Sequence, residues 1–304
     1  MNKKSRFLAV DILLLLGAIL PLVACMVLKI LTAPPTEGIE ITGALIYFTL
    51  PTPLQPLPIT EAQVNSVAVI LAILFICLYF THGLTVRPHL KRQVIAEWIV
   101  STCKNMVRTN MGERFMGFAP FIAAIMGLSA LSSLLSLLGL FPPTSDMNIV
   151  AGWAILVFAL ITFYKFKAGP IQYLKSYAEP VPFLAPMNII SEIATPVSMA
   201  FRHYGNILSG SIISVLIAAA LGGLSNLVLG WLPGILGDFP LLRIGIPAVL
   251  SLYFDIFSGL LQAFIFATLT MMYISGGYPA EAVAKRLARR EAKKQAKTAK
   301  KAEK

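Results

Sequence analysis

Two apolar stretches limit how this chain can fold more than any other feature. Residues 188–231 form a stretch of 44 residues with only two charged side chains, and a second stretch covers the 33 residues 243–275. As straight helices they would measure about 66 Å and about 50 Å, whereas the hydrocarbon core of a bilayer is about 30 Å thick. Each must therefore lie strongly tilted in a membrane or be interrupted, and Gly222-Gly223 is the expected position of a break in the first.

The first stretch carries Arg202, whose guanidinium group cannot lose its charge in a protein. Placing it near the bilayer centre costs about 2.5–3.5 kcal/mol on insertion scales, so such a residue normally faces a helix bundle, a partner or a water-filled path. Helical spacing puts four polar side chains on the same face: Thr195, Ser198, Asn206 and Ser209. This polar stripe predicts an ion path or a binding surface. The alternative is an arginine neutralised by an internal carboxylate that only holds helices together.

Composition places the whole chain in a membrane. Of its 304 residues 57% are hydrophobic and 13% are charged, and the long apolar runs exceed what one globular core would bury. The net charge of +11 lies in loops and tails beside apolar segments, which is typical of membrane topology rather than of a nucleic-acid partner. The cysteines and histidines lack the spacing of a disulfide framework or a metal site, and we expect neither a metal nor a cofactor.

Four further apolar segments are expected to span the bilayer, at residues 7–33, 64–80, 118–141 and 149–166. With the two long stretches they make about six membrane segments. Of the 25 Lys and Arg residues, 22 lie in the N-terminus, residues 81–117, residues 165–187 and the tail. The positive-inside rule then places both chain ends in the cytoplasm. The expected fold is an all-α polytopic membrane protein.

The N-terminal segment, residues 1–33, has more than one possible fate. Its apolar run of about 27 residues is long for a signal peptide and long enough to span a bilayer. Leu22-Val23-Ala24-Cys25 resembles a lipoprotein cleavage site, but the apolar run continues beyond it as MVLKILTA. We expect a retained membrane segment; removal as a signal and lipidation of Cys25 are the alternatives.

The regions between the spans have distinct compositions. Residues 34–62 contain glutamates but no Lys or Arg, which predicts an extracytoplasmic loop. Residues 81–117 mix cations with large apolar side chains such as Trp98, which predicts an amphipathic helix on the membrane surface. Residues 167–187, rich in proline and aromatic residues, are expected to form a loop, and residues 279–304 a basic cytoplasmic tail.

Three stretches, in order, resemble the a subunits of F-type ATP synthases, the membrane stators that face the rotating c-ring. Ser191-Glu192 with PVSMAFRHYGNILSG at 196–210 is similar to the family's run around its essential arginine. PTSDMN at 143–148 resembles a turn between two spans, and GLLQAFIFATLTMMYIS at 259–275 resembles the final helix. The resemblance covers most of residues 45–278. It implies an ion-translocating unit at residues 63–278, in which two long tilted helices face the c-ring.

The resemblance also implies a function. The chain would be a non-catalytic stator subunit in the bacterial plasma membrane, coupling ion flow, expected to be of protons, to ATP synthesis or hydrolysis. Its partners would be the c-ring subunits, the subunit b stalk and the rest of the ATP synthase. Arg202 would attract the ionised c-ring carboxylate, drive release of its ion and keep ions from passing directly between two half-channels. A guanidinium suits this role because, unlike lysine, it stays protonated.

Other roles are implied residue by residue. Asn206 and Gln262 match polar positions beside the arginine and in the final helix. Asp255 matches a position where relatives place a titratable channel residue, and by i−7 spacing it shares a helix face with Gln262. Glu192 matches an acid near the inner half-channel. For each of these, a buried polar group that packs helices together is the alternative interpretation.

Two departures from the family pattern affect the outer proton path. Many relatives have a Glu nine residues after the arginine, paired with a His in the final helix, and here those positions are Ser211 and Asp255. His203 stands where relatives usually have an apolar residue. An imidazole titrates near neutral pH and could relay protons, but His203 points about 100° away from Arg202, so a packing role is equally open.

Two functions of other classes remain as alternatives. Intramembrane Arg and Asp are also typical of stand-alone secondary ion transporters, but no internal repeat relates the two halves of this chain. A non-translocating assembly scaffold with a degenerate stator fold would be favoured by loss of Arg202 or Gln262, and both residues are present.

Overall fold

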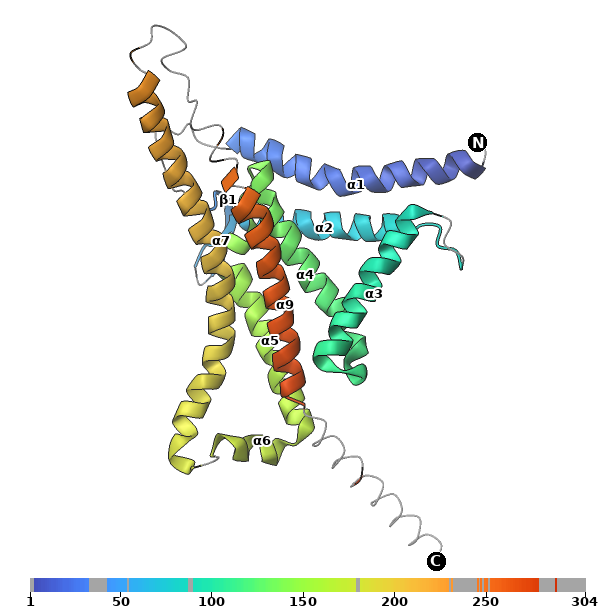
Figure 1. Ribbon diagram of the computed structural model, residues 1–304, viewed down its shortest axis with the longest axis vertical. Helices are drawn as coiled ribbons and strands as arrows, with labels where there is room; N and C mark the ends of the chain where they lie inside the picture. Colours follow the sequence, from blue (N-terminus) through green and yellow to red (C-terminus); the bar gives the residue numbers. More distant parts are fainter. Residues whose placement is uncertain are drawn as a thin grey trace, which may run out of the picture.

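The fold is almost entirely helical in the part that the structure, a computed structural model, describes (Figure 1). That part comprises residues 3–32, 43–53, 55–86, 90–178, 181–229 and 252–278, with positions 231, 245, 247, 249, 250 and 288. Within it, six helices are long and apolar enough to cross a membrane, as the sequence predicts. The predicted basic tail lies outside the described residues, apart from position 288.

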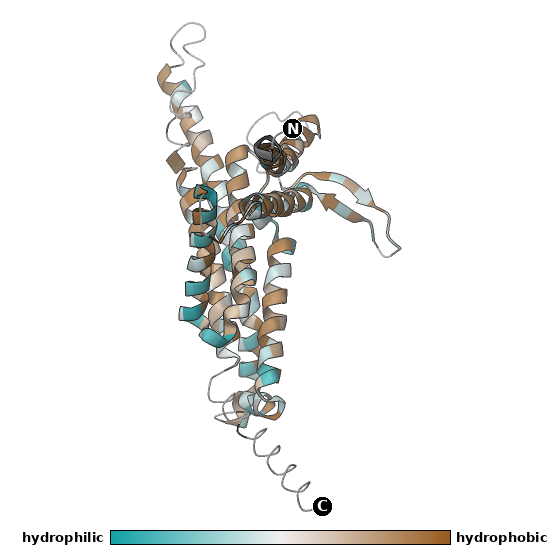
Figure 2. Cartoon of the chain, turned by 90° about the vertical axis from the view of Figure 1, so that its right-hand side faces the viewer, coloured by the Kyte–Doolittle hydropathy of each residue, from teal (hydrophilic) through white to brown (hydrophobic). Residues whose placement is uncertain are grey.

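The first two membrane helices lie side by side and antiparallel. α1 (Lys3–Thr32) and α2 (Glu61–Thr81) cross one end of the molecule together (Figure 1). Between them, β1 (Ile46–Leu50) and β2 (Leu57–Thr60) form an antiparallel hairpin that projects away from the helices (Figure 2). The expected irregular loop is therefore partly a hairpin, in a region whose β-branched and aromatic residues have high strand propensity.

The predicted amphipathic segment is helical and leads into the third membrane helix. α3 (Lys91–Met111) ends at Gly112, whose φ of 86° is a conformation that glycine tolerates. The chain then turns through the 3₁₀ segment η1 (Glu113–Phe118) into α4 (Ala119–Leu134), which is extended by η2 (Leu135–Leu138). One side of α3 exposes apolar residues, among them Trp98. Placement of α3 on the membrane surface stays a prediction.

A short turn, η3 (Pro143–Ser145), precedes α5 (Met147–Ala168). Asp146 caps α5, because its Oδ1 accepts a hydrogen bond of 2.9 Å from the backbone N–H of Asn148. The predicted loop at 167–187 is wrong in part. It contains α6 (Pro170–Tyr177) and η4 (Pro182–Leu184), which begin at prolines that favour the first turn of a helix.

The long apolar stretch folds into one helix, α7 (Ala185–Leu229), of 45 residues. The predicted break at Gly222-Gly223 is wrong, because the helix passes through both residues. Glycine inside a helix costs only about 1 kcal/mol relative to alanine, so two glycines do not oblige a helix to end. The tilt remains as the way to accommodate a helix of about 67 Å.

The final membrane helix begins with a π-helical turn. η6 (Leu252–Ser258) continues directly into α9 (Gly259–Gly276), whereas residues 243–244, the start of the predicted stretch, lie outside the described residues. π-helical turns are rare and occur frequently at functional sites. This one contains Asp255.

The main apolar core lies between α3, α4, α5, α7 and α9. Its buried side chains come from all five helices and from η1, and include Val107, Ile122, Val157, Met199 and Phe266. α7 and α9 pack against each other and run crosswise to α1 and α2 (Figure 1). A bilayer crossed upright by α1 and α2 would therefore hold α7 and α9 strongly slanted, which accommodates their length.

Candidate functional site

Arg202 lies on the outer face of α7. The inner face of that helix is formed by the buried residues Met199, Ala200, His203 and Gly210, whereas Arg202 is exposed, as are Ser198 and Ser209 of the predicted stripe. Among the described residues, no carboxylate pairs with the guanidinium group. The alternative of an arginine neutralised by an internal carboxylate is therefore not supported in the described part of the chain. The charge of Arg202 faces outward.

Two members of the stripe connect it to neighbouring backbone and to the last helix. Thr195 is half-buried and its Oγ1 donates a hydrogen bond of 3.1 Å to the carbonyl oxygen of Ser191. Asn206, one turn beyond Arg202, donates from Nδ2 to Oγ of Ser258 at 2.8 Å. This bond ties α7 to the π-helical turn η6 and fixes the amide beside the arginine.

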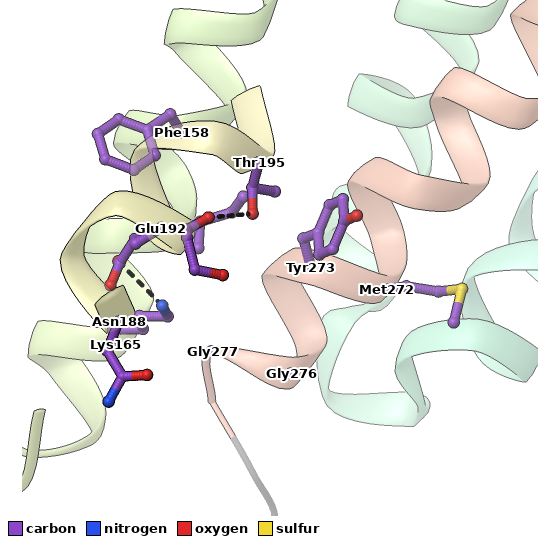
Figure 3. A pocket seen from close by; sticks show the side chains of 11 residues that line it. Phe158, Lys165, Asn188, Glu192, Thr195, Met272, Tyr273, Gly276 and Gly277 are labelled. Atoms are coloured by element: carbon purple, nitrogen blue, oxygen red, sulfur yellow. Dashed lines mark hydrogen bonds and ion pairs between the residues drawn. The ribbon is translucent and has the colours of Figure 1, made fainter. Parts of the chain in front are cut away.

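Glu192 lies at an open pocket of about 300 Å³ between α7, α5 and the end of α9. Its Oε1 is 2.9 Å from Nζ of Lys165 and accepts a hydrogen bond of 2.8 Å from the hydroxyl group of Tyr173. Figure 3 shows Glu192 and Thr195 of α7 on one side of this space and Tyr273 of α9 on the other. A carboxylate with a cation and hydroxyl groups around it, in a pocket open to the outside, is an entrance through which a hydrated ion could pass.

Two tyrosines of α6 hold the Glu192 carboxylate from one side. Burial raises the pKa of both Tyr173 and Tyr177, and their hydrogen bonds to Glu192 raise it further. Both phenols therefore stay protonated at neutral pH and act as hydrogen-bond donors. The two hydroxyl groups also bond to each other.

Asp255 lies in the π-helical turn η6, half-buried, with its carboxyl group beside the hydroxyl group of Ser136 in η2. The surrounding helices approach closely. A Cβ atom on Gly210 would lie 3.1 Å from the ring of Phe254, and one on Gly259 would lie 2.7 Å from Cβ of Ser133. The glycines therefore allow α7 and α4 to enclose this turn from two sides.

His203 is fully buried among four helices. Its Nε2 lies 3.2 Å from Oγ of Ser129 on α4, and its ring contacts Trp153 of α5 and Phe266 of α9 with centroids 6.0 Å and 5.3 Å away. Its Nδ1 has no hydrogen-bond partner among the described residues. Of the two roles left open for it, this environment favours interhelical packing.

The remaining predicted residues lie apart from each other. Gln262 is buried on α9, with 4% of its surface exposed. Ser211 is exposed on α7, and its hydroxyl group bonds to the carbonyl oxygen of Leu208. Asp255 lies beside Ser136 of η2, and no hydrogen bond joins it to Ser211 among the described residues.

Arg202 stands between two separate acidic sites along α7. Glu192 precedes it by ten residues, or about 15 Å of helix. On the other side, the contacts of Asn206 with Ser258 and of Gly210 with Phe254 place the η6 turn about 6–12 Å beyond Arg202. The main geometric result is that the charge of Arg202 lies between the Glu192 pocket and the η6 turn, which are at different positions along α7.

Sequence reasoning did not identify four contributors to these sites: Ser129, Ser136, Lys165 and Tyr173. The serines were indistinguishable from the other small residues of an apolar helix, and Lys165 was counted only toward membrane topology. Tyr173 and Tyr177 have the i, i+4 spacing of neighbours on a helix, which was the one available signal, but their segment was interpreted as a loop.

Comparison with known proteins adds an independent observation. Residues 64–275 match the family described as ATP synthase A chain. The ATP synthase subunit a of Macrococcus caseolyticus is 34% identical over 252 residues, covering 79% of this chain and 95% of that protein. The Bacillus subtilis ATP synthase subunit a is 34% identical over 215 residues, covering 67% of this chain and 85% of that protein. That of Legionella pneumophila is 26% identical over 226 residues, covering 74% and 89%.

Proposed function

The chain belongs to the ATP synthase A chain family, the a subunits of F-type ATP synthases, and on this premise we propose how its residues move ions. It is a multi-pass protein of the bacterial plasma membrane and the stator subunit of the Fo sector, and it assembles with the c-ring. Our proposal is that it provides two half-channels, one on each side of Arg202, through which ions, expected to be protons, reach and leave the c-ring carboxylates.

The observation that carries the proposal is the outward charge of Arg202 between two acidic sites. A guanidinium group that pairs with no carboxylate among the described residues is available to a carboxylate on another chain. Attraction to Arg202 favours the ionised form of an approaching carboxylate, so that carboxylate releases its ion there. The same fixed positive charge repels a cation moving along α7 from one site to the other.

We assign the pocket at Glu192 to the inner, cytoplasmic half-channel. Lys165 lines the pocket and belongs to a region that the positive-inside rule places in the cytoplasm, as does the basic sequence that follows Tyr278. Glu192 would accept and return protons here, while Lys165 and Tyr173 keep its carboxylate oriented toward the pocket. Thr195, one turn nearer to Arg202, continues the polar path.

Replacing Glu192 with glutamine should slow ion transport without stopping it. Because the pocket is open to water, other hydrated routes remain, and we expect roughly a threefold loss, about 0.7 kcal/mol on the barrier. ATP-driven transport in inverted vesicles measures the effect. Glu113→Gln is a suitable control, since Glu113 is exposed and forms an ion pair of 2.7 Å with the exposed Arg108. Equal rates in wild type and Glu192→Gln would remove Glu192 from the path.

We assign the η6 turn to the outer half-channel. Asp255 is its titratable group, Ser136 is the neighbouring hydroxyl group, and Asn206 and Ser258 lead toward Arg202. Gln262 contributes a buried amide on the same final helix. One acid then serves where many relatives use an acid and a histidine. His203 supports the path by packing, and Ser211 lies at its outer edge.

The chain itself is proposed to be non-catalytic, with the nucleotide chemistry on other subunits. Subunit b is the further proposed partner. Affinity purification tests this assembly: a small, highly apolar c subunit and soluble ATPase subunits should co-purify. Recovery of the chain alone, or only with copies of itself, would favour a transporter.

Measuring the transported ion tests the function directly. In inverted vesicles that contain the complex, ATP should drive acidification that an uncoupler abolishes and that does not depend on sodium. Sodium uptake that survives the uncoupler would contradict the proton assignment. Assembly without either form of transport would contradict ion translocation and favour the scaffold.

We also propose that α1 is a retained part of the subunit. Two ion pairs hold it: Asp11 lies 2.6 Å from Arg92 of α3, and Lys29 lies 3.0 Å from the buried Glu61 of α2. Cys25 is buried against α2, where an attached lipid would have no room. Gly17 lets the two helices approach so closely that a Cβ atom there would lie 2.6 Å from Phe75.

Intact mass spectrometry of the subunit should therefore find residues 1–33 present and Cys25 unmodified; a chain that begins after residue 25 would contradict retention. Lys29→Met should lower the thermal midpoint of the complex, because the buried Glu61 loses its cation, at a cost of about 1–3 kcal/mol. Lys29→Arg keeps the charge and is the control. Equal midpoints for the two variants would mean that the ion pair does not hold α1.

A further inference from the structure

A second pocket, separate from the Glu192 site, lies where three membrane helices end. It has a volume of about 310 Å³ and is formed by residues of η1, the last turn of α5 and the end of α9. Its lining residues are Arg114, Phe115, Gly117, Phe118, Tyr164, Lys167 and Tyr278. The pocket therefore combines two cations with four aromatic rings.

Arg114 is held in place with most of its donors still available. One Nη2 bond of 3.0 Å goes to the carbonyl oxygen of Tyr278, and the guanidinium carbon lies 5.5 Å and 5.6 Å from the rings of Phe115 and Tyr278. A guanidinium group has five N–H donors in a planar arrangement that matches the oxygens of a phosphate group. Stacking on two rings fixes that plane at the edge of the pocket.

Lys167 supplies the second positive charge from α5. Its Nζ lies 5.4 Å from the ring of Tyr164 and 5.8 Å from that of Phe163. Phe163 is 58% exposed on the outer surface of α5, next to the pocket. The site thus has a charged interior beside an apolar outer surface, an arrangement that suits a molecule with an anionic head and an apolar body.

The location limits which anions can reach the pocket. Its three elements end at the cytoplasmic face by the distribution of positive charge, and the tail that follows Tyr278 has ten Lys and Arg residues against three Glu. The cytoplasmic leaflet carries anionic lipids, and basic pockets between membrane helices on this side bind their head groups. A volume of about 310 Å³ accommodates a phosphate group with its glycerol.

We propose that this pocket binds the phosphate group of an anionic phospholipid, with Arg114 and Lys167 on the phosphate and the acyl chains lying along Phe163. A bound lipid would brace the ends of α5 and α9 against η1. The site does not take part in the proposed ion path, and the inference does not depend on it.

The test measures lipid retention by the purified complex. Wild-type complex is reconstituted in nanodiscs of phosphatidylcholine with phosphatidylglycerol, extracted into detergent, and its bound phosphatidylglycerol is counted by native mass spectrometry. With about 1 kcal/mol for each cation, Arg114→Gln with Lys167→Gln should weaken retention about 30-fold. Lys104→Gln with Lys175→Gln removes the same charge from two exposed positions outside the pocket and should retain the lipid.

Three controls keep the outcomes distinct. Recovery of the c-ring with each variant reports assembly, and Arg114→Lys, which keeps the charge, should retain more lipid than Arg114→Gln. Equal retention by wild type and the double pocket variant would overturn the proposal. Radioactive inorganic phosphate that binds lipid-depleted wild type but not the pocket variant, with phosphatidylglycerol retention unchanged, would assign the pocket to free phosphate and overturn the lipid.

Discussion

Arg202→Ala should reduce ATP-driven ion transport to below about 1% of the wild-type rate while the complex still assembles, a change of at least about 2.7 kcal/mol in the barrier. Arg202 is exposed and has no carboxylate partner among the described residues, so its removal leaves no unpaired charge inside the subunit. The fold should therefore be unaffected. What we expect to be lost is the charge that is proposed to ionise the c-ring carboxylate and to separate the two half-channels.

The matched control is Arg108→Ala. Arg108 is exposed, and its Nε lies 2.7 Å from Oε1 of the exposed Glu113. Exposed ion pairs contribute about 0–1 kcal/mol, so assembly and transport should stay close to wild type. Passive ion flow after removal of the soluble ATPase provides a second readout, because loss of the barrier between the half-channels should raise uncoupled leakage. Wild-type pumping by Arg202→Ala would refute the central role of this residue.

Asp255→Asn should slow transport about tenfold, equivalent to about 1.4 kcal/mol in the barrier, because the outer path loses its titratable group. Asparagine keeps the size of the side chain and can still bond to Ser136, so packing of the η6 turn should be preserved. The rate should also lose pH dependence that arises from this carboxyl group. Measuring ATP-driven transport over a range of pH on the outer side checks both effects.

Asp146→Asn makes the same chemical change at a position with a different role. Asp146 caps α5, and asparagine caps a helix about as well as aspartate, so transport should be unchanged. If Asp255→Asn and Asp146→Asn behaved alike across pH, Asp255 would be a packing residue. Asp255→Glu, which restores a carboxyl group, should recover more activity than Asp255→Asn.

The membrane fold was largely predictable because its signals, apolar length and helical spacing, can be read directly along the sequence. Apolar length located the six membrane helices, and i±4 and i±7 spacing placed Ser198, Arg202 and Ser209 on one exposed face of α7. The elements that were missed or misplaced depend on contacts between distant residues. The hairpin, α6 and the continuity of α7 through Gly222-Gly223 each follow from local preferences too weak to decide the outcome alone.

The sequence predicted individual residues of the candidate site within each helix, but not the contacts between helices. Sequence reasoning selected Glu192, Arg202 and Asp255 individually, but the partners that give them their environment come from elsewhere in the chain. Lys165 reaches Glu192 from α5, and Ser136 lies beside Asp255 from η2.

The unbroken course of α7 has a mechanical consequence. Under the proposed function, each c subunit that passes Arg202 exerts a sideways force on it, and a continuous helix transmits that force to its supports. Those supports are the Lys165–Glu192 ion pair on one side and the His203 contacts with α4, α5 and α9 beside the arginine itself. A hinge next to Arg202 would let the arginine move with the c-ring. A continuous helix would instead hold it in place, so that in the proposed function the reaction torque passes into the stationary part of the complex.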